Sequence, residues 1–110
     1  MSRKVGMQEP LAIGELDQIE FDYSGNFAED SIYGIASVAV TITVARGDDP
    51  APEGLEADAP TISGKSAFIP VQGSVRNVTY LVECLATTDE PVPRVLAAAC
   101  YLPVVKLGQS

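Results

Sequence analysis

Short segments of alternating pattern, each ended by turn-forming residues, constrain the fold of this chain more than any other feature. From residue 15 onward, Gly, Pro, Asn, Asp and Ser interrupt the sequence about every 8–12 residues. No stretch repeats its apolar residues with the period of an amphipathic helix. The spacing therefore predicts an all-β fold with roughly six or seven strands, arranged as an antiparallel sandwich or barrel. For a chain of 110 residues, an immunoglobulin-like antiparallel β-sandwich with an extended N-terminal arm fits best.

Alternation of apolar and polar side chains locates the strands. Ile19, Phe21 and Tyr23 alternate with acidic residues, as expected for a strand with one buried face. The segment 31–45 is rich in β-branched side chains, which favour strands over helices. The predicted strands cover residues 16–23, 31–45, a short piece at 55–57, 66–71, 77–88 and 95–105.

Glycine, proline and cysteine positions add detail to this plan. Gly34 either splits the second segment into two strands or marks a bulge. Pro70 has no backbone N–H, so it predicts that its strand lies at a sheet edge. The turn at 89–93 joins the last two strands into a hairpin, in which Cys84 and Cys100 share a face one diagonal step apart. A disulfide between them is disfavoured in a cytosolic assembly.

The chain divides into one folded domain with short extensions. Residues 1–14 lack a stable period and form an extended arm, residues 15–106 form the sandwich, and residues 107–110 form a short tail. No apolar run approaches the ~18 residues that a membrane span needs, so we expect no membrane partner. Three apolar side chains make the arm a candidate partner-binding segment: Met7, Leu11 and Ile13.

Charge and composition argue against several classes of function. The chain has 15 acidic and 7 basic residues, for a net charge of −8, and such a surface repels the phosphates of nucleic acids. It contains no histidine, the commonest general base and metal ligand near neutral pH. It also lacks a nucleophile elbow, a phosphate-binding glycine loop and a recognisable pair of carboxylates. We therefore expect a protein that is not an enzyme, with no catalytic residues and no cofactor.

One acidic loop contains two patterns with a functional interpretation. Arg46-Gly47-Asp48 matches an adhesion tripeptide, but the dense turn-forming residues around it indicate a turn that ends a strand. The acids of the loop could surround calcium, yet they lack the spacing of a calcium-binding loop, and solvation is the simpler interpretation. We therefore predict no metal site. The acids concerned are Asp48, Asp49, Glu53, Glu56 and Asp58.

Several short motifs follow one another in a fixed order between about residues 14 and 105. Their order and spacing resemble a family of small immunoglobulin-like structural proteins of tailed bacteriophages. The chain departs from the family pattern at two surface turns, with Gly73-Ser74 in place of Gly-Gly and Asp89-Glu90-Pro91 in place of a Ser-Asp-Gly-like turn. The motifs are Asp22-Tyr23-Ser24, Asp30 with Ile32, Gly73-Ser74, Tyr80-x-Val82-x-Cys84 with Thr87 and Thr88, and Leu102-Pro103-Val104.

The resemblance implies a structural role in a phage particle. It predicts a capsid-decorating or minor head protein, located in the virion and assembled in the bacterial host cytoplasm. Such a protein would dock on the major capsid protein or other virion subunits through the N-terminal arm and an edge of the sandwich. A homo-oligomer is a further option for its assembly. The alternatives are a head-to-tail connector or tail component, and a carbohydrate-binding or adhesion module at the virion surface.

Overall fold

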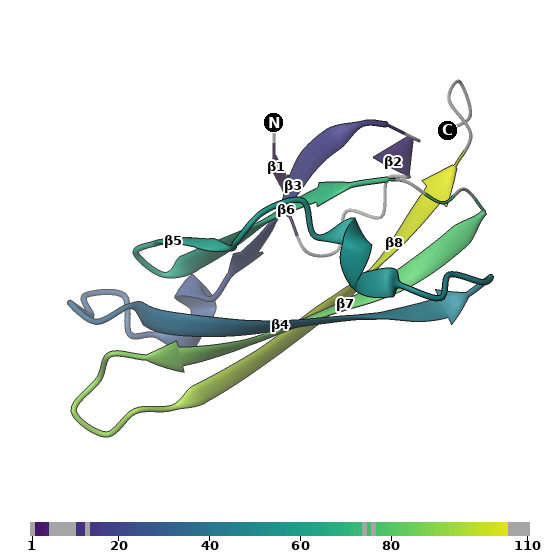
Figure 1. Ribbon diagram of the computed structural model, residues 1–110. Helices are drawn as coiled ribbons and strands as arrows, with labels where there is room; N and C mark the ends of the chain where they lie inside the picture. Colours follow the sequence, from purple (N-terminus) through teal and green to yellow (C-terminus); the bar gives the residue numbers. More distant parts are fainter. Residues whose placement is uncertain (1, 5–10, 13, 74, 76, 106–110) are drawn as a thin grey trace.

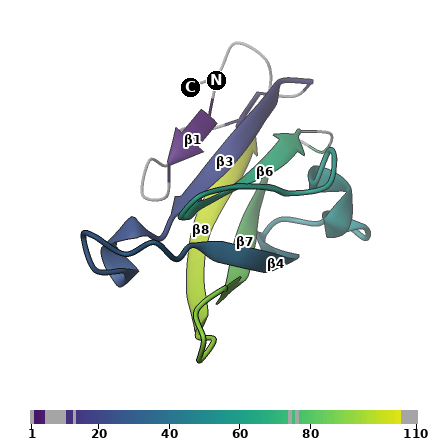
Figure 2. The same cartoon turned by 90° about the vertical axis from the view of Figure 1, so that its left-hand side faces the viewer.

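The computed structural model describes residues 2–4, 11–12, 14–73, 75 and 77–105. Within them, two four-stranded sheets pack face to face, so the predicted β-sandwich is confirmed. Figures 1 and 2 show the two layers from directions 90° apart. The strands are β1 (Ser2–Lys4), β2 (Leu11–Ala12), β3 (Leu16–Asp22), β4 (Ile35–Arg46), β5 (Thr61–Ser63), β6 (Ser66–Gln72), β7 (Val78–Thr88) and β8 (Val95–Val105).

The two sheets differ in the lengths of their strands and in which strands lie at their edges. The first sheet has the order β1-β3-β6-β5, and the second has the order β2-β8-β7-β4. All pairs are antiparallel except those of the two N-terminal strands, because β1 runs parallel to β3 and β2 runs parallel to β8. The three long strands β4, β7 and β8 all belong to the second sheet, which is therefore the larger layer in Figure 1.

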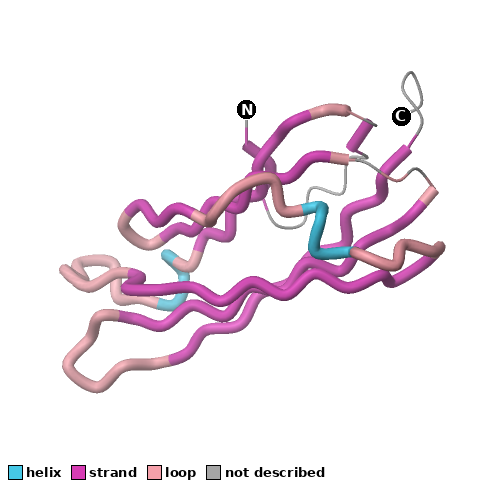
Figure 3. The backbone as a smooth tube through the Cα atoms, viewed as in Figure 1, coloured by secondary structure: helices cyan, strands magenta, loops and turns pink. Residues whose placement is uncertain are grey.

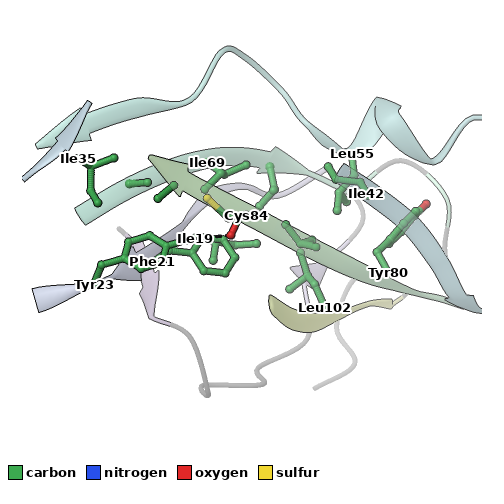
Figure 4. Close-up of a cluster of buried hydrophobic side chains, with 14 of the residues drawn as sticks. Ile19, Phe21, Tyr23, Ile35, Ile42, Leu55, Ile69, Tyr80, Cys84 and Leu102 are labelled. Carbon is green, nitrogen blue, oxygen red and sulfur yellow. Dashed lines mark hydrogen bonds between the residues drawn. The ribbon is translucent and has the colours of Figure 1, made fainter. Parts of the chain in front are cut away.

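The core lies between the sheets and is built by the predicted alternation. Ile19 and Phe21 of β3 face inward, and they are opposite Ile69 and Ala67 of β6. Alternate residues of β7, from Val78 to Ala86, complete the other wall, because side chains of a strand point to opposite faces in turn. Figure 4 shows these side chains meeting from both layers. The fully buried residues include Phe21, Ile69, Val71, Tyr80, Val82, Cys84 and Val104.

The predicted arm forms strands of the sandwich where it is described. Its residues 2–4 are β1, beside β3, and its residues 11–12 are β2, beside the end of β8. The two pieces therefore lie at edges of opposite sheets. Met7 and Ile13 lie outside the described residues, as does the predicted tail 107–110. Leu11, the third apolar residue of the arm, pairs in register with Val104.

The edge position predicted from Pro70 is wrong, because β6 lies between β3 and β5. The prediction failed because a strand can be central along one part of its length and open along another. Strand β5 pairs with β6 only as far as Phe68, so the missing N–H of Pro70 leaves no ladder partner unsatisfied. The Pro70 carbonyl accepts the Ala57 N–H at 2.9 Å on this side.

Two further details differ from the sequence-based plan. The short strand predicted at 55–57 is instead the end of a 3-10 helix, η2 (Pro52–Leu55), followed by a single bridge from Glu56 to Val71. Gly34 precedes β4, and the β-bulge lies between Ile35 and Ser37. The other helix, η1 (Ser24–Asn26), has three residues, and no helix among the described residues has the length and apolar character to cross a membrane. Figure 3 shows how little of the backbone is helical.

Candidate interaction surface

The outward side of the second sheet is the feature of this molecule that most needs an explanation. Inward and outward residues alternate on β4, β7 and β8. A row of Arg46, Thr79 and Pro103 lies beyond the second register shift of β4. Between the two register shifts of β4, the three strands align twelve outward residues in four rows. We call these residues the outer face. Its rows are Ser37, Thr87 and Val95; Ala39, Leu85 and Ala97; Thr41, Glu83 and Ala99; and Thr43, Leu81 and Tyr101.

The outer face is nearly uncharged and largely apolar, because seven of its twelve positions are apolar and four carry only a hydroxyl group: Ser37, Thr41, Thr43 and Thr87. Leu85 is 47% exposed, Val95 is 65% exposed and Tyr101 is 51% exposed. Ala97 and Ala99 lie between Val95 and Tyr101 on β8, so no large side chain projects from the surface between those two residues. Glu83 is the only charged residue among the twelve positions of the four rows, although the chain carries 22 charged side chains. Large apolar patches of this kind on a soluble domain commonly mark an interaction site.

Hydrogen bonds from main-chain N–H groups hold the start of β4 to the end of β7 and to the turn between β5 and β6. The Gly34 N–H donates to Asp89 Oδ1 at 2.9 Å, and the Asp89 N–H donates to the Gly34 carbonyl at 3.0 Å. The Ile35 N–H donates to the Gly64 carbonyl at 2.9 Å, which joins the first sheet to this end. A Cβ on Gly34 would lie 2.4 Å from the Gly64 oxygen, so this close approach requires glycine. Gly34 therefore allows the chain before β4 to pack against the backbone at Gly64.

The turn between β7 and β8 is fixed by a second set of polar contacts. Buried Thr88 accepts the Arg94 N–H at its Oγ1 and donates its hydroxyl to Glu90, both at 2.9 Å. Arg94 Nε donates to Glu90 at 2.7 Å, and the guanidinium lies 5.5 Å from the ring centre of Phe27. The hydrogen bonds from Arg94 and Thr88 lower the pKa of Glu90, and the Arg94 pKa is raised by the same pair. These contacts hold both ends of the turn together.

The loop that contains the adhesion-like tripeptide is tied to the opposite end of β7. Arg46 is the last residue of β4, and Gly47 turns the chain with a φ of 99° against the Asn77 carbonyl. Tyr80 donates its hydroxyl to Asp49 Oδ2 at 2.5 Å, and burial together with this hydrogen bond raises the Tyr80 pKa. The turn predicted at Arg46-Gly47-Asp48 is therefore confirmed. Among the described residues, no three His, Cys, Asp or Glu side chains gather as a metal site would require.

One buried tyrosine joins the two sheets through the core. The Tyr23 hydroxyl donates to the Cys84 carbonyl at 3.0 Å, across the sandwich from the end of β3 to the middle of β7. Burial raises the pKa of Tyr23 and also that of the Cys84 thiol. Cys84 is opposite Ala98, and Cys100 is opposite Val82, as the diagonal spacing predicted. A thiol with a raised pKa is a poor nucleophile at neutral pH.

The structure brings together a surface that the predicted binding residues do not include. Leu11 lies next to β8 at Val104, beyond the last row of the outer face, and Met7 and Ile13 are not described. A signal for the outer face was present in the sequence, because residues 95–105 contain no charge and Leu81 and Leu85 interrupt the polar side of β7. That signal does not say which strands are neighbours. Sheet order supplies this information, since it aligns the three strands.

Comparison with known proteins gives no further assignment. No family model, no curated protein and no solved structure matches this chain.

Proposed function

We propose that this protein is a non-enzymatic structural component of a phage particle, which docks on the capsid as a decorating or minor head protein. The observation that carries the proposal is the outer face of the second sheet, which offers a nearly uncharged and largely apolar surface for protein association. The family resemblance of the sequence motifs supplies the capsid as the partner. The outer face is the surface through which we expect the docking.

The immunoglobulin-like assignment belongs to the same proposal. Strands β3, β6 and β5 follow one another in the first sheet, and β8, β7 and β4 follow one another in the second. This is the order that a constant-type immunoglobulin domain has for its B, E and D strands and its G, F and C strands. The strand order supports the resemblance, whereas the parallel pairing of β1 with β3 is a departure from an all-antiparallel sandwich.

Docking through the outer face needs little affinity from each copy. Burying exposed side chains such as Leu85, Val95 and Tyr101 gains roughly 25 cal/mol per Å² of apolar surface, before the loss of rotational and translational freedom is subtracted. Many equivalent sites on a capsid lattice raise the effective concentration of a protein that bridges neighbouring subunits. The arm residues beside β8 would lie next to this contact, which is consistent with a docking role for residues 1–14.

A connector or tail component is the second candidate, because the same surface could dock on a ring of portal or tail subunits. Copy number separates the two assignments. Quantitative mass spectrometry of purified particles should find this chain in numbers comparable to the major capsid protein if it decorates the capsid. About a dozen copies or fewer would place it in the connector or tail, where rings contain few subunits. Its absence from purified particles would refute the virion proposal.

A pair of variants tests the docking surface itself. Leu85→Glu places a charge at the centre of the outer face, and we expect it to lower the copy number per particle at least tenfold. Leu16→Glu is the matched control, because Leu16 is a 66% exposed leucine of the other sheet. The control should be incorporated normally. Equal incorporation of the two variants would show that the outer face does not dock on the particle.

A further inference from the structure

The backbone of β8 has an open side, and this side is distinct from the outer face. In an antiparallel ladder, the residues that bond to one neighbour recur at every second position. The Thr88 N–H donates to the Arg94 carbonyl at 2.9 Å, and the register continues without a shift from Thr87 opposite Val95 to Val78 opposite Val104. The even-numbered residues of β8 therefore bond to β7. The odd-numbered ones direct their N–H and C=O groups away from β7: Val95, Ala97, Ala99, Tyr101 and Pro103.

Most of this open side is not paired by any described strand. Among the described residues, β2 is the strand that lies there, and it pairs with β8 at Val104 and Val105. Pro103 has no N–H to offer. Within the part of the chain that the structure describes, the segment that can accept another strand therefore extends from Val95 to Tyr101, and it carries no charge, no proline and no bulge.

The other sheet edges carry the protection that such edges usually have. Strands β1 and β5 have three residues each, too short to template a long ladder. Strand β4 has register shifts at both of its ends and contacts η2, and it ends on Arg46. Bulges, short strands and terminal charges are the devices by which proteins prevent edge pairing. The β8 segment has none of them.

We propose that the β8 edge pairs antiparallel with the same edge of a second copy of this chain. The midpoint of the segment from Val95 to Tyr101 is Ala98, so a two-fold axis at Ala98 uses the whole segment and leaves β2 undisturbed. This axis places Val95 opposite Tyr101 of the partner subunit, and Ala97 opposite Ala99 of the partner subunit. The main-chain N–H and C=O groups of all these residues point to the open side of β8, so the two residues of each pair exchange two hydrogen bonds. The contact of an aromatic with a β-branched side chain is among the favourable cross-strand pairs.

The charges of the two copies permit this arrangement. The only charge of the outer face, Glu83, lies one strand inside the edge, so the two Glu83 side chains would be separated by three strand spacings, or about 14 Å. That distance exceeds the Debye length of ~8 Å at physiological salt. The product is a continuous sheet in which both outer faces lie side by side. Its outermost edges are two copies of the bulged β4, so pairing ends at the dimer.

The oligomeric state of the isolated full-length protein tests the proposal without any phage particle. It is therefore independent of the proposed capsid role. Four paired residues make a small contact, so we expect a reversible dimer in sedimentation velocity between about 1 μM and about 1 mM. Hydrogen exchange at the Ala97 and Ala99 amides should slow as the concentration increases. A monomer throughout this range, larger open oligomers, or a dimer whose Ala97 and Ala99 amides exchange as in the monomer would each overturn the proposal.

A matched pair of substitutions identifies the edge. Ala97→Lys places two lysines near the two-fold axis, and we expect at least tenfold weaker dimerisation, about 1.4 kcal/mol. Ala39→Lys is the control, because Ala39 lies in the same row of the outer face but on β4, at the far edge of the sheet. The control should change the dimer dissociation constant by about twofold or less. Equal effects of the two lysines would overturn the assignment to β8.

A backbone substitution separates hydrogen bonding from surface charge. Ala99→Pro removes an N–H that faces the open edge and leaves the bonds from β8 to β7 in place. It should abolish the dimer while the circular dichroism spectrum still shows a folded β-protein. A folded Ala99→Pro variant that dimerises like the parent would overturn the proposed pairing.

Discussion

The outer surfaces of the two sheets differ in charge and in apolar content, although the inner surfaces of both sheets are apolar. On the first sheet, the outward positions of β3 and β6 include polar side chains such as Gln18, Glu20 and Gln72 together with Leu16, Phe68 and Pro70, and the Ser66 hydroxyl donates to Glu20 at 3.1 Å. On the second sheet, β7 and β8 present leucines, alanines, a valine and a tyrosine, with Glu83 as the single charge of the four rows. The core needs only one face of each sheet. A solvated sheet usually carries polar and charged side chains on its outer side, so the nearly uncharged outer face of the second sheet, with its leucines, alanines, valine and tyrosine, needs a further reason.

The difference separates what the sandwich needs for folding from what it needs for association. Side chains that face inward are buried whether or not a partner is present. Side chains of the outer face remain in water in the isolated chain, so they add little to its stability and gain free energy only when another surface covers them. The following predictions test this separation, from the largest expected effect to the smallest.

Inward residues of both sheets should matter equally for folding. Ile69→Ala in β6 and Leu102→Ala in β8 each remove a fully or nearly fully buried side chain and leave a cavity. We expect each to lower the free energy of unfolding by about 2–5 kcal/mol, measured by chemical denaturation. A loss below about 1 kcal/mol for one of them would mean that its sheet does not share the common core.

The hydrogen bond from Tyr23 to the Cys84 carbonyl should make a smaller contribution that belongs to both sheets. Tyr23→Phe keeps the ring in the core and removes the hydroxyl that crosses between the layers. The expected loss is about 1 kcal/mol in the free energy of unfolding. Tyr33→Phe, at a partly buried tyrosine next to the core, is a control for loss of a hydroxyl alone. Equal losses in both variants would remove the case for a special link between the sheets.

Exposed leucines should differ between the sheets in association but not in folding. Leu85→Ser and Leu16→Ser remove a leucine from the outer side of the second and the first sheet, respectively. Both should change the free energy of unfolding by less than about 1 kcal/mol. Leu85→Ser should require more ammonium sulfate for precipitation than Leu16→Ser, because it reduces the larger apolar surface. The reverse order would contradict the contrast between the two outer faces.

The smallest effect concerns the exposed pair that fixes the turn into β8. The pKa of Glu90 is lowered in the folded chain by its hydrogen bonds from Arg94 and Thr88, so its contribution to stability is present above the ordinary glutamate pKa of 4.5. That contribution is lost as the pH falls through the lowered pKa. Glu90→Gln should therefore lower the free energy of unfolding slightly at neutral pH. It should also make the melting temperature slightly less dependent on acid pH. An unchanged acid profile would show that the pair does not contribute to stability.

Much of the fold could be predicted from the sequence, because alternation determines which side chains are buried wherever one face of a strand meets a core. The strands 16–23, 77–88 and 95–105 were located closely for this reason, and the hairpin register followed from the turn at 89–93. The strand predicted at 55–57 is wrong, because three residues are too few to show the period of a strand. Pro70 was assigned to an edge because a sequence does not show how far the neighbouring strand extends.

The candidate surface was the less predictable part. Leu81, Leu85 and the uncharged segment 95–105 were visible as apolar residues, but each could have been buried by an element elsewhere in the chain. Met7 and Ile13 remain predictions, because they lie outside the described residues. Leu11 forms part of an edge strand, a role that the irregular pattern of the arm did not indicate.

The sequence by itself determined that this chain is a sandwich of strands, since the positions of turn residues and the period of two depend on local chemistry. It also determined the inward residues of strands that alternate clearly, such as Ile19 and Phe21, because there only one face of the strand is apolar. Only the tertiary structure decided that β4, β7 and β8 are neighbours, that their outward residues form one largely apolar face, and that no strand among the described residues pairs with the free side of β8 between Val95 and Tyr101. These properties depend on which strands pair, and strand pairing joins residues far apart in the chain, which no local pattern records.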